Sequence, residues 1–177
     1  GSGPGNLVQA AKDHGWHATG LELSHWSVEV GRKNNLEIFE GTLEQAAFPA
    51  NTFNAISMFD VLEHLPHPAE YVKEIYRILK PNGVVVAETP NVEGFFAKNL
   101  YREQSDVVKP RAHICLYSPE TAQKLFSPFA EVSIKTFPYC RKYTPGYFKS
   151  VVVSRLKPSL PITQLTYNES LRIRAWK

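Results

Sequence analysis

Short apolar runs and amphipathic stretches follow one another along most of the chain. Four runs have the character of strands, at residues 17–23, 36–41, 52–59 and 84–89. The last run, VVVAET, is almost continuously apolar, which is typical of a strand buried on both faces. Between these runs, residues 24–34 and 68–80 carry apolar side chains at helical spacing. The alternation predicts an α/β fold with a mostly parallel, doubly wound sheet.

Capping residues support the boundaries of these helices. Ser24 and Ser118 are placed to cap helix N-termini, and Pro119 suits the first helical position after Ser118. At the end of the helix over 68–80, the KPNG segment predicts a stop, because Pro81 bars continuation and Gly83 is free to take a left-handed conformation.

The second half of the chain is less regular. Residues 90–117 form a long polar and aromatic connection, of a length that usually marks a lid or a binding loop. Residues 131–140 and 146–157 have strand patterns and predict a C-terminal antiparallel hairpin. We predict no element for the tail, residues 158–177, and place the domain boundary at residue 157.

Composition narrows the function without identifying it. The length of 177 residues suits one domain. The 20 basic residues are interspersed with 17 acidic ones and give a net charge of +3, so the sequence lacks the runs of basic residues that are typical of nucleic-acid-binding proteins. Apolar runs are too short to span a bilayer. Cys115 and Cys140 form neither a metal motif nor a disulfide framework, which favours a reducing cytoplasm.

The opening GSGPGN has two readings, the remnant of a cleaved tag or a ligand-binding turn. The second is favoured because a short helical pattern follows, so that bare backbone N–H groups and a helix N-terminus would face a ligand. Glu22 ends the next strand, about 20 residues after the glycines, where a carboxylate can accept hydrogen bonds from both ribose hydroxyls. This geometry does not separate nicotinamide-binding domains from their relatives.

Five segments together resemble one family, and they are GSGPGN, TGLELS, FEGTLEQAAFPANTFNAISMFDVLEHLPHP, EIYRILKPNGVVVAETPN and LYSPETAQKLF. They resemble, in order, the class I S-adenosylmethionine-dependent methyltransferases, in particular small-molecule enzymes related to those of ubiquinone and menaquinone biosynthesis. The resemblance implies a Rossmann-like fold, methyl transfer to oxygen or nitrogen of a small molecule, and S-adenosyl-L-homocysteine as product. A nicotinamide-dependent oxidoreductase and a non-catalytic binding module of the same fold remain as alternatives.

The same resemblance assigns residues to the cofactor. The turn would approach the methionine and ribose parts, Glu22 would hold the ribose diol, and Thr42 would stand in for the usual Asp beside adenine. The full set implied is Gly1, Gly3, Gly5, Glu22, Leu23, Thr42, Leu43, Phe59 and Asp60.

The family also carries a central strand before the glycine turn, and this sequence begins at the turn. Loss of a central strand would leave interior N–H and C=O groups unpaired, each costing roughly 1 to 3 kcal/mol. We therefore expect the methyltransferase domain over residues 1–157 to be a fragment that lacks its N-terminal strand.

Histidines supply the candidate catalytic groups. His64 or His113 would remove a proton from the acceptor, although each also suits a structural role. Asp60 and Glu63 either cap the turn after a strand or join the site. The spacing of Asp60, Glu63, His64 and His113 resembles the E-x-x-E-H segment and distant histidine that bind a divalent metal in small-RNA 2′-O-methyltransferases and certain ubiquinone-pathway enzymes. That resemblance implies magnesium or manganese.

Overall fold

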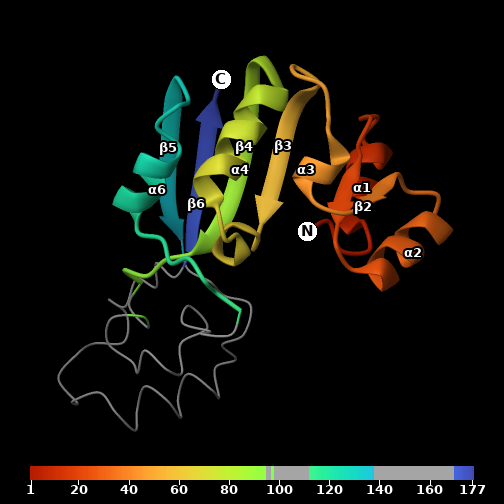
Figure 1. Cartoon of the computed structure of the whole chain (residues 1–177), viewed down its shortest axis with the longest axis horizontal. Coiled ribbons are helices and arrows are strands. Elements are labelled where there is room, and N and C mark those ends of the chain that lie inside the picture. The colour runs from red at the N-terminus through yellow and green to blue at the C-terminus, as the bar shows by residue number, and fades with distance from the viewer. Residues whose placement is uncertain (95–96, 98–111, 138–169) are drawn as a thin grey trace, which may run out of the picture.

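The computed structural model describes residues 1–94, 97, 112–137 and 170–177, and within them it confirms the expected alternation of strands and helices (Figure 1). Ser24 and Ser118 cap helices as predicted, since their side chains accept the backbone N–H groups of Ser27 and Thr121. The described elements are α1 (Asn6–Asp13), β1 (Gly20–Glu22), α2 (His25–Lys33), β2 (Ile38–Glu40), α3 (Leu43–Ala46), β3 (Phe53–Phe59), the 3-10 helix η1 (Leu62–His64), α4 (Pro68–Ile78), β4 (Leu79–Pro90), α6 (Pro119–Leu125), β5 (Glu131–Phe137) and β6 (Ser170–Trp176).

The strands form two sheets. β1 and β2 pair in parallel, and four further strands follow the order β3-β4-β6-β5, with β6 antiparallel to both of its neighbours. Among the described residues β3 pairs with β4 alone, and the backbone N–H groups of Gly1 and Ser2 both donate to the Leu21 carbonyl of β1. The strand expected before the glycine turn stays a prediction.

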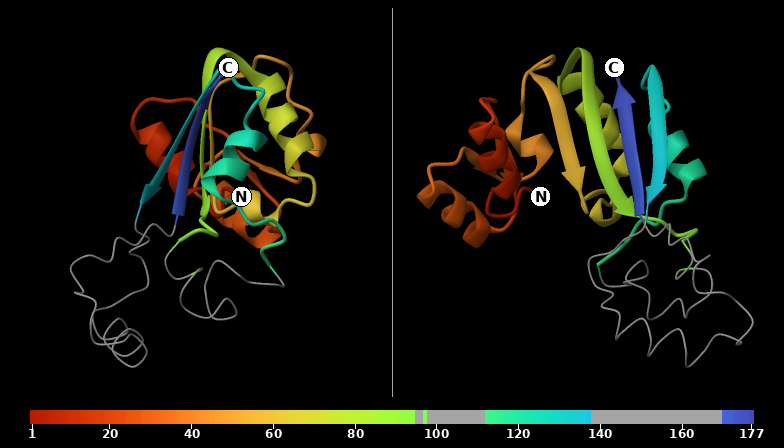
Figure 2. Two further views of the ribbon diagram at one scale, coloured as in Figure 1. Left: turned by 90° about the vertical axis from the view of Figure 1, so that its left-hand side faces the viewer. Right: turned by 180° about the vertical axis from the view of Figure 1, so that it is seen from behind.

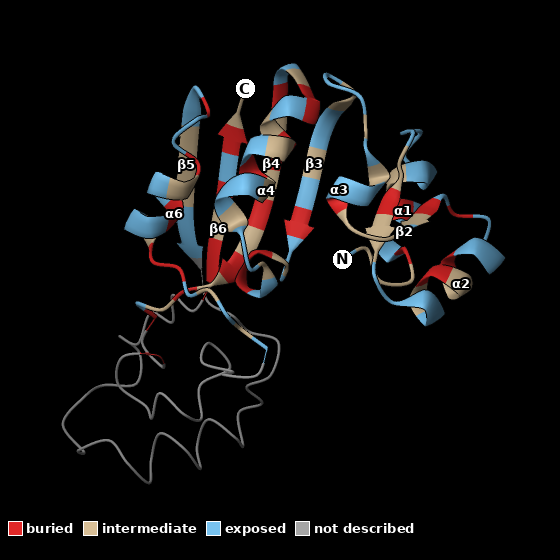
Figure 3. Cartoon of the chain, viewed as in Figure 1, coloured by how far each residue is buried: buried red, intermediate tan, exposed pale blue. Residues whose placement is uncertain are grey.

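The main core lies between the four-stranded sheet and two helices. α4 and α6 cover the same face of this sheet, as the views from the side and from behind show (Figure 2). Buried positions recur along β4 and β6 (Figure 3). The largest fully buried side chains of the core include Ile173 of β6, Leu62 of η1, Ile75 of α4 and Phe126 at the end of α6. A second, smaller core of four buried residues packs α1 and α2 onto β1 and β2, and it consists of Val8, Val28, Leu36 and Ile38.

The tail contributes a strand that the sequence analysis missed. β5 pairs antiparallel with β6, which comes from residues 170–176, whereas the expected hairpin partner at 146–157 lies outside the described residues. β6 lies between β4 and β5, and its buried positions alternate at Leu171, Ile173 and Ala175. The expected boundary at residue 157 also lies outside the described residues.

The left-handed residue after α4 is Asn82, so the prediction for Gly83 is wrong. Asn82 has φ of 62°. Asparagine tolerates this region because its short polar side chain bonds locally. Gly83 is required for a different reason, since a Cβ there would lie 2.8 Å from the Lys80 carbonyl oxygen.

Candidate functional site

The glycine turn and Glu22 meet at the end of β1. The Gly3 N–H donates to Glu22 Oε2 at 2.8 Å, across 19 positions of sequence. The N–H groups of Leu23 and Ser24 donate to the other oxygen, Oε1, at 3.0 and 2.9 Å. The structure therefore brings together the two features whose spacing first indicated a ligand site.

These amides determine the charge state of Glu22. Partial burial works against ionisation, but the hydrogen bonds from the N–H groups of Ser24, Gly3 and Leu23 favour the charged form, and the pKa of the carboxyl is lowered. Glu22 is thus a carboxylate at neutral pH. Its Oε2 accepts one of these bonds and Oε1 accepts two, so Oε2 retains an acceptor position for a hydroxyl.

Gly5 fixes the shape of the turn as it enters α1. Its φ of 91° lies in the left-handed region, and a Cβ would approach Leu36 Cδ1 to 2.6 Å. Gly5 is the N-cap of α1, and no side chain accepts a hydrogen bond from the amides of the first helical turn. At the other end of the turn, a Cβ on Gly1 would lie 2.9 Å from Val61 Cγ2, so the backbone passes close to the end of β3.

The remaining residues expected to hold a cofactor differ in their exposure and in the contacts that they make. Leu23 and Phe59 are exposed, with 70% and 42% of their surface accessible. Leu43 lies in the main core, and the Thr42 hydroxyl accepts the Gln45 N–H as the cap of α3. Contacts of these side chains with a cofactor stay a prediction.

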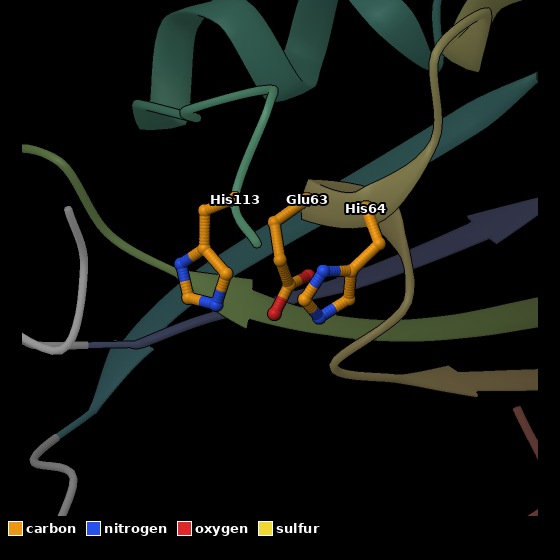
Figure 4. Close-up of side chains that lie close together, drawn as sticks. All are labelled: Glu63, His64 and His113. Carbon is orange, nitrogen blue, oxygen red and sulfur yellow. The ribbon is translucent and has the colours of Figure 1, made fainter. Parts of the chain in front are cut away.

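A second cluster, which we call the imidazole cluster, consists of Glu63, His64 and His113 (Figure 4). One ligand atom from each residue lies within 4.8 Å of the others, and the two imidazole rings meet edge to face with centroids 5.0 Å apart. Glu63 and His64 come from η1, whereas His113 lies near the end of the long connection over residues 90–117. Asp60, exposed and with φ of 53°, lies outside this group.

Glu63 is the buried member, with 2% of its surface exposed. Burial raises the pKa of its carboxyl, and the negative charge of Asp60 adds to this, while hydrogen bonds and nearby His64 oppose it. The Thr89 hydroxyl of β4, itself buried, donates to Glu63 Oε2 at 2.9 Å. Sequence reasoning missed Thr89, since a threonine inside an apolar strand carries no local signal.

Residues 112–117 form an extended segment, the strap, which lies against η1. The N–H groups of Ile114 and Cys115 donate to the Glu63 carbonyl at 2.8 and 3.1 Å, and the Tyr117 hydroxyl donates to the Leu62 carbonyl at 3.2 Å. These bonds hold the strap against η1 and so place His113 in the imidazole cluster. The strap holds together residues some fifty positions apart, for which the sequence offers no periodic signal.

A glycine turn joined to an acid at a strand end, beside a polar cluster at the ends of β3 and β4, is typical of nucleotide-binding α/β domains. Comparison with known families is more specific. The model of a methyltransferase domain family matches residues 1–129, and the chain belongs to that family.

Individual relatives agree with this assignment. The chain is 34% identical over 88 residues to sterol 24-C-methyltransferase ERG6A of Gibberella zeae, covering 45% of this chain and 23% of that protein. It is 30% identical over 98 residues to a ubiquinone biosynthesis O-methyltransferase of Photobacterium profundum, covering 51% and 42%. The chain thus spans less than half the length of these relatives.

A solved structure supports the fold over the whole chain. A SAM-dependent methyltransferase from Archaeoglobus fulgidus superposes with a TM-score of 0.73 at 17% identity, covering 100% of this chain and 83% of that one. The fold is therefore the Rossmann-like methyltransferase fold that the sequence analysis expected. Among the described helices, none has the length and apolar character needed to cross a bilayer.

Proposed function

We propose that the chain is the catalytic domain of an S-adenosylmethionine-dependent methyltransferase that acts on oxygen or nitrogen of a small molecule. The observation that carries the proposal is the bond between the Gly3 amide and the Glu22 carboxylate, because it places an acid with a vacant acceptor position beside a bare glycine turn. Membership of the methyltransferase domain family supports it.

In this proposal the first sheet binds the cofactor. Gly1, Gly3 and Gly5 let it approach the backbone, and Glu22 accepts a ribose hydroxyl. Further contacts would come from the residues that flank the turn and the strand ends, namely Leu23, Thr42, Leu43, Phe59 and Asp60. When bound, the cofactor supplies an electrophilic methyl group on a sulfonium.

The chemistry requires little more than alignment and proton removal from the acceptor. Exclusion of water and orientation account for much of the rate in such a displacement. His64 is exposed and lies beside His113, and we assign general-base catalysis to these imidazoles, because a neutral imidazole carries a nitrogen lone pair that can accept the proton of the acceptor.

A second role for the imidazole cluster is a divalent metal site. Glu63, His64 and His113 each present one ligand atom within 4.8 Å of the others, so two imidazoles and one carboxylate fit an ion. This donor set suits manganese or zinc better than magnesium, which prefers oxygen ligands alone. An ion there would acidify an acceptor hydroxyl. If chelation by EDTA leaves turnover intact, the metal role is excluded.

Calorimetry tests the proposal against its alternatives. S-adenosylhomocysteine should bind and NAD should not, since the family match and the antiparallel β6 fit the former class. Binding of NAD alone would favour an oxidoreductase. Binding of S-adenosylhomocysteine without turnover, measured by mass spectrometry over a panel of phenols and amines, would favour a non-catalytic module.

The proposal also covers the acceptor, the partners and the cellular location of the protein. We propose a small-molecule acceptor, no nucleic-acid partner, and a cytoplasmic location, on the basis of the mild charge and the two cysteines. Fractionation of the cells that express the protein would test the location.

A further inference from the structure

The hydrogen bond of His64 fixes which of its ring nitrogens carries a proton. Nδ1 lies 2.7 Å from the carbonyl oxygen of Ala112. A carbonyl oxygen only accepts hydrogen bonds, so Nδ1 must be the donor. In the neutral ring the lone pair is then on Nε2. Free histidine in water favours the opposite tautomer, with the proton on Nε2.

Ala112 is held in place by the rest of the strap rather than by its own side chain. The Glu63 carbonyl accepts two N–H groups, from Ile114 and Cys115, and the Leu62 carbonyl accepts the Tyr117 hydroxyl. Beyond Tyr117, the Val92 N–H donates to the Tyr117 carbonyl at 2.9 Å, which ties the strap to the end of β4. The acceptor for His64 is therefore positioned by bonds at several points along the strap.

The exposed side chains of the strap do not form the hydrogen bonds that hold it against η1. Ile114 has 56% of its surface exposed and Leu116 has 41%. The bonds to η1 come instead from the backbone and from Tyr117, which is buried. The strap thus binds η1 through groups that a change of the Ile114 side chain does not touch.

We infer that the strap is a positioning element that selects the Nδ1–H tautomer of His64 and so directs the Nε2 lone pair toward the acceptor. This inference rests on the proposed function of His64 as a base. The lone pair on Nε2 can receive the proton that a hydroxyl or amine acceptor loses, which is the substrate class of the proposed function. The acceptor forms its bond to the methyl carbon, the sulfur–carbon electron pair returns to sulfur, and the acceptor proton moves to Nε2.

Histidine-selective ¹⁵N NMR of the cofactor-free chain tests the tautomer without any turnover, with His64→Gln to assign the signal. We expect a protonated Nδ1 and an unprotonated Nε2 in the neutral ring. A wild-type His64 that carries its proton on Nε2 would overturn the inference. If this spectrum is as expected but no cofactor binds, the proposed function fails and the tautomer assignment stands.

A matched pair at position 114 tests the strap itself. Ile114→Pro removes the N–H that donates to Glu63, whereas Ile114→Ala keeps it and removes only exposed side chain. We expect the proline variant to gain Nε2–H tautomer and lose about tenfold in kcat, less than the 10² to 10⁴ that a general base contributes, because the base is misplaced and not removed. Its Kd for S-adenosylhomocysteine should stay within about twofold, and the alanine variant, which keeps the N–H, should keep the wild-type tautomer.

Tyr117→Phe gives an independent measurement, which also serves if the proline variant does not fold. It removes one oxygen and the bond to the Leu62 carbonyl. A smaller loss of kcat in the same direction, with KM unchanged and a matching tautomer shift, supports the inference. An unchanged tautomer with wild-type kcat in this variant, or a shifted tautomer with full kcat in either variant, contradicts it.

Discussion

The two sheets build their polar sites in opposite ways. Beside β1 the site is made of backbone, because amides of the glycine turn and of Leu23 and Ser24 surround one carboxylate. At the end of β3 it is made of side chains, because Glu63, His64 and His113 converge from two distant segments. The first site has a core of four small aliphatic residues behind it, while the second has the main core.

In the proposed function, this difference separates the site that binds the cofactor from the site that carries out the chemistry. A backbone site tolerates little variation in shape, since any Cβ on Gly1 or Gly5 meets a neighbouring side chain. A side-chain site can lose one functional group and still fold, provided that its scaffold remains. Variants in the first sheet should therefore change stability and cofactor affinity, and variants in the imidazole cluster should change turnover.

The largest effect is expected from His64→Ala. Removal of a general base costs a factor of 10² to 10⁴ in rate, so kcat should fall at least about 100-fold. The hydrogen bond of His64 goes to Ala112 of the strap, away from the glycine turn, so affinity for S-adenosylhomocysteine should hold. Steady-state kinetics and calorimetry on the same preparation measure both quantities.

His113→Ala is the matched control for that variant. His113 comes from the other side of the cluster and its ring packs edge to face on His64. If His64 acts alone as the base, this change should cost clearly less. Equal losses in both variants, reversed by neither manganese nor zinc, would mean that the imidazoles act as one unit.

Gly5→Ala should produce the next largest effect, on stability. Alanine at φ of 91° is strained, and its Cβ would also strike Leu36 and Ile38 of the small core. Together these terms should lower the free energy of unfolding by about 3 kcal/mol. Gly15→Ala has a similar φ of 79° with open space around it, so it isolates the strain from the clash. Equal losses in the two variants, measured by urea unfolding, would disprove the close approach.

Local patterns in the sequence were enough to predict much of the first sheet and the scaffold of the second. The spacing of the glycines to Glu22, and the caps Ser24 and Ser118, depend on contacts within a few residues or on one strand–turn–helix unit. β6 and the strap were missed because their partners lie far away in the chain. Pairing over such distances depends on the packing of the whole core and leaves no period in the sequence.

The site residues, too, were predicted only in part from the sequence. Glu63, His64 and His113 were all identified as candidates from residue type and spacing, but Asp60 was grouped with them and the structure leaves it outside. Its φ of 53° ends β3 with a sharp change of direction. Residue spacing along a chain does not report such a turn, so it cannot tell which carboxylate points to the histidines.

Glu22→Ala tests the backbone site more directly than any glycine variant. It removes the carboxylate that accepts from Gly3 and that is proposed to accept a ribose hydroxyl, so affinity for S-adenosylmethionine should weaken by about 2 kcal/mol. Glu22→Gln keeps an acceptor oxygen without the charge and should lose less. Calorimetry that finds wild-type affinity in Glu22→Ala would remove Glu22 from the site.

The free energy of unfolding at acid pH should also depend on Glu22. Its pKa is lower in the folded chain than in the unfolded chain, so the folded state is favoured above the unfolded value, and this contribution disappears as pH falls through the folded value. Urea unfolding between neutral and acid pH should show a steeper loss for wild type than for Glu22→Gln. Parallel curves would contradict the role of the amides.

Glu63→Gln should have the smallest effect and the opposite sign. Burial raises the pKa of Glu63 in the fold, so the native state holds this proton more tightly than the unfolded chain does. Wild type therefore loses stability as pH rises from the unfolded pKa through the folded one, and above both it carries the full cost of a buried charge. Glutamine has no charge to bury and still accepts from Thr89, so the variant should be more stable at pH 8 by about 1 kcal/mol. The advantage should shrink toward pH 4.

Glu120→Gln is the control. Exposed Glu120 pairs with Lys124, which lowers the pKa of Glu120, so removal of this carboxylate should bring no gain in stability at any pH. A Glu63→Gln variant that is less stable than wild type at pH 8 would show that the carboxylate stabilises the fold, and the imidazole cluster would then be a structural feature as much as a site for chemistry.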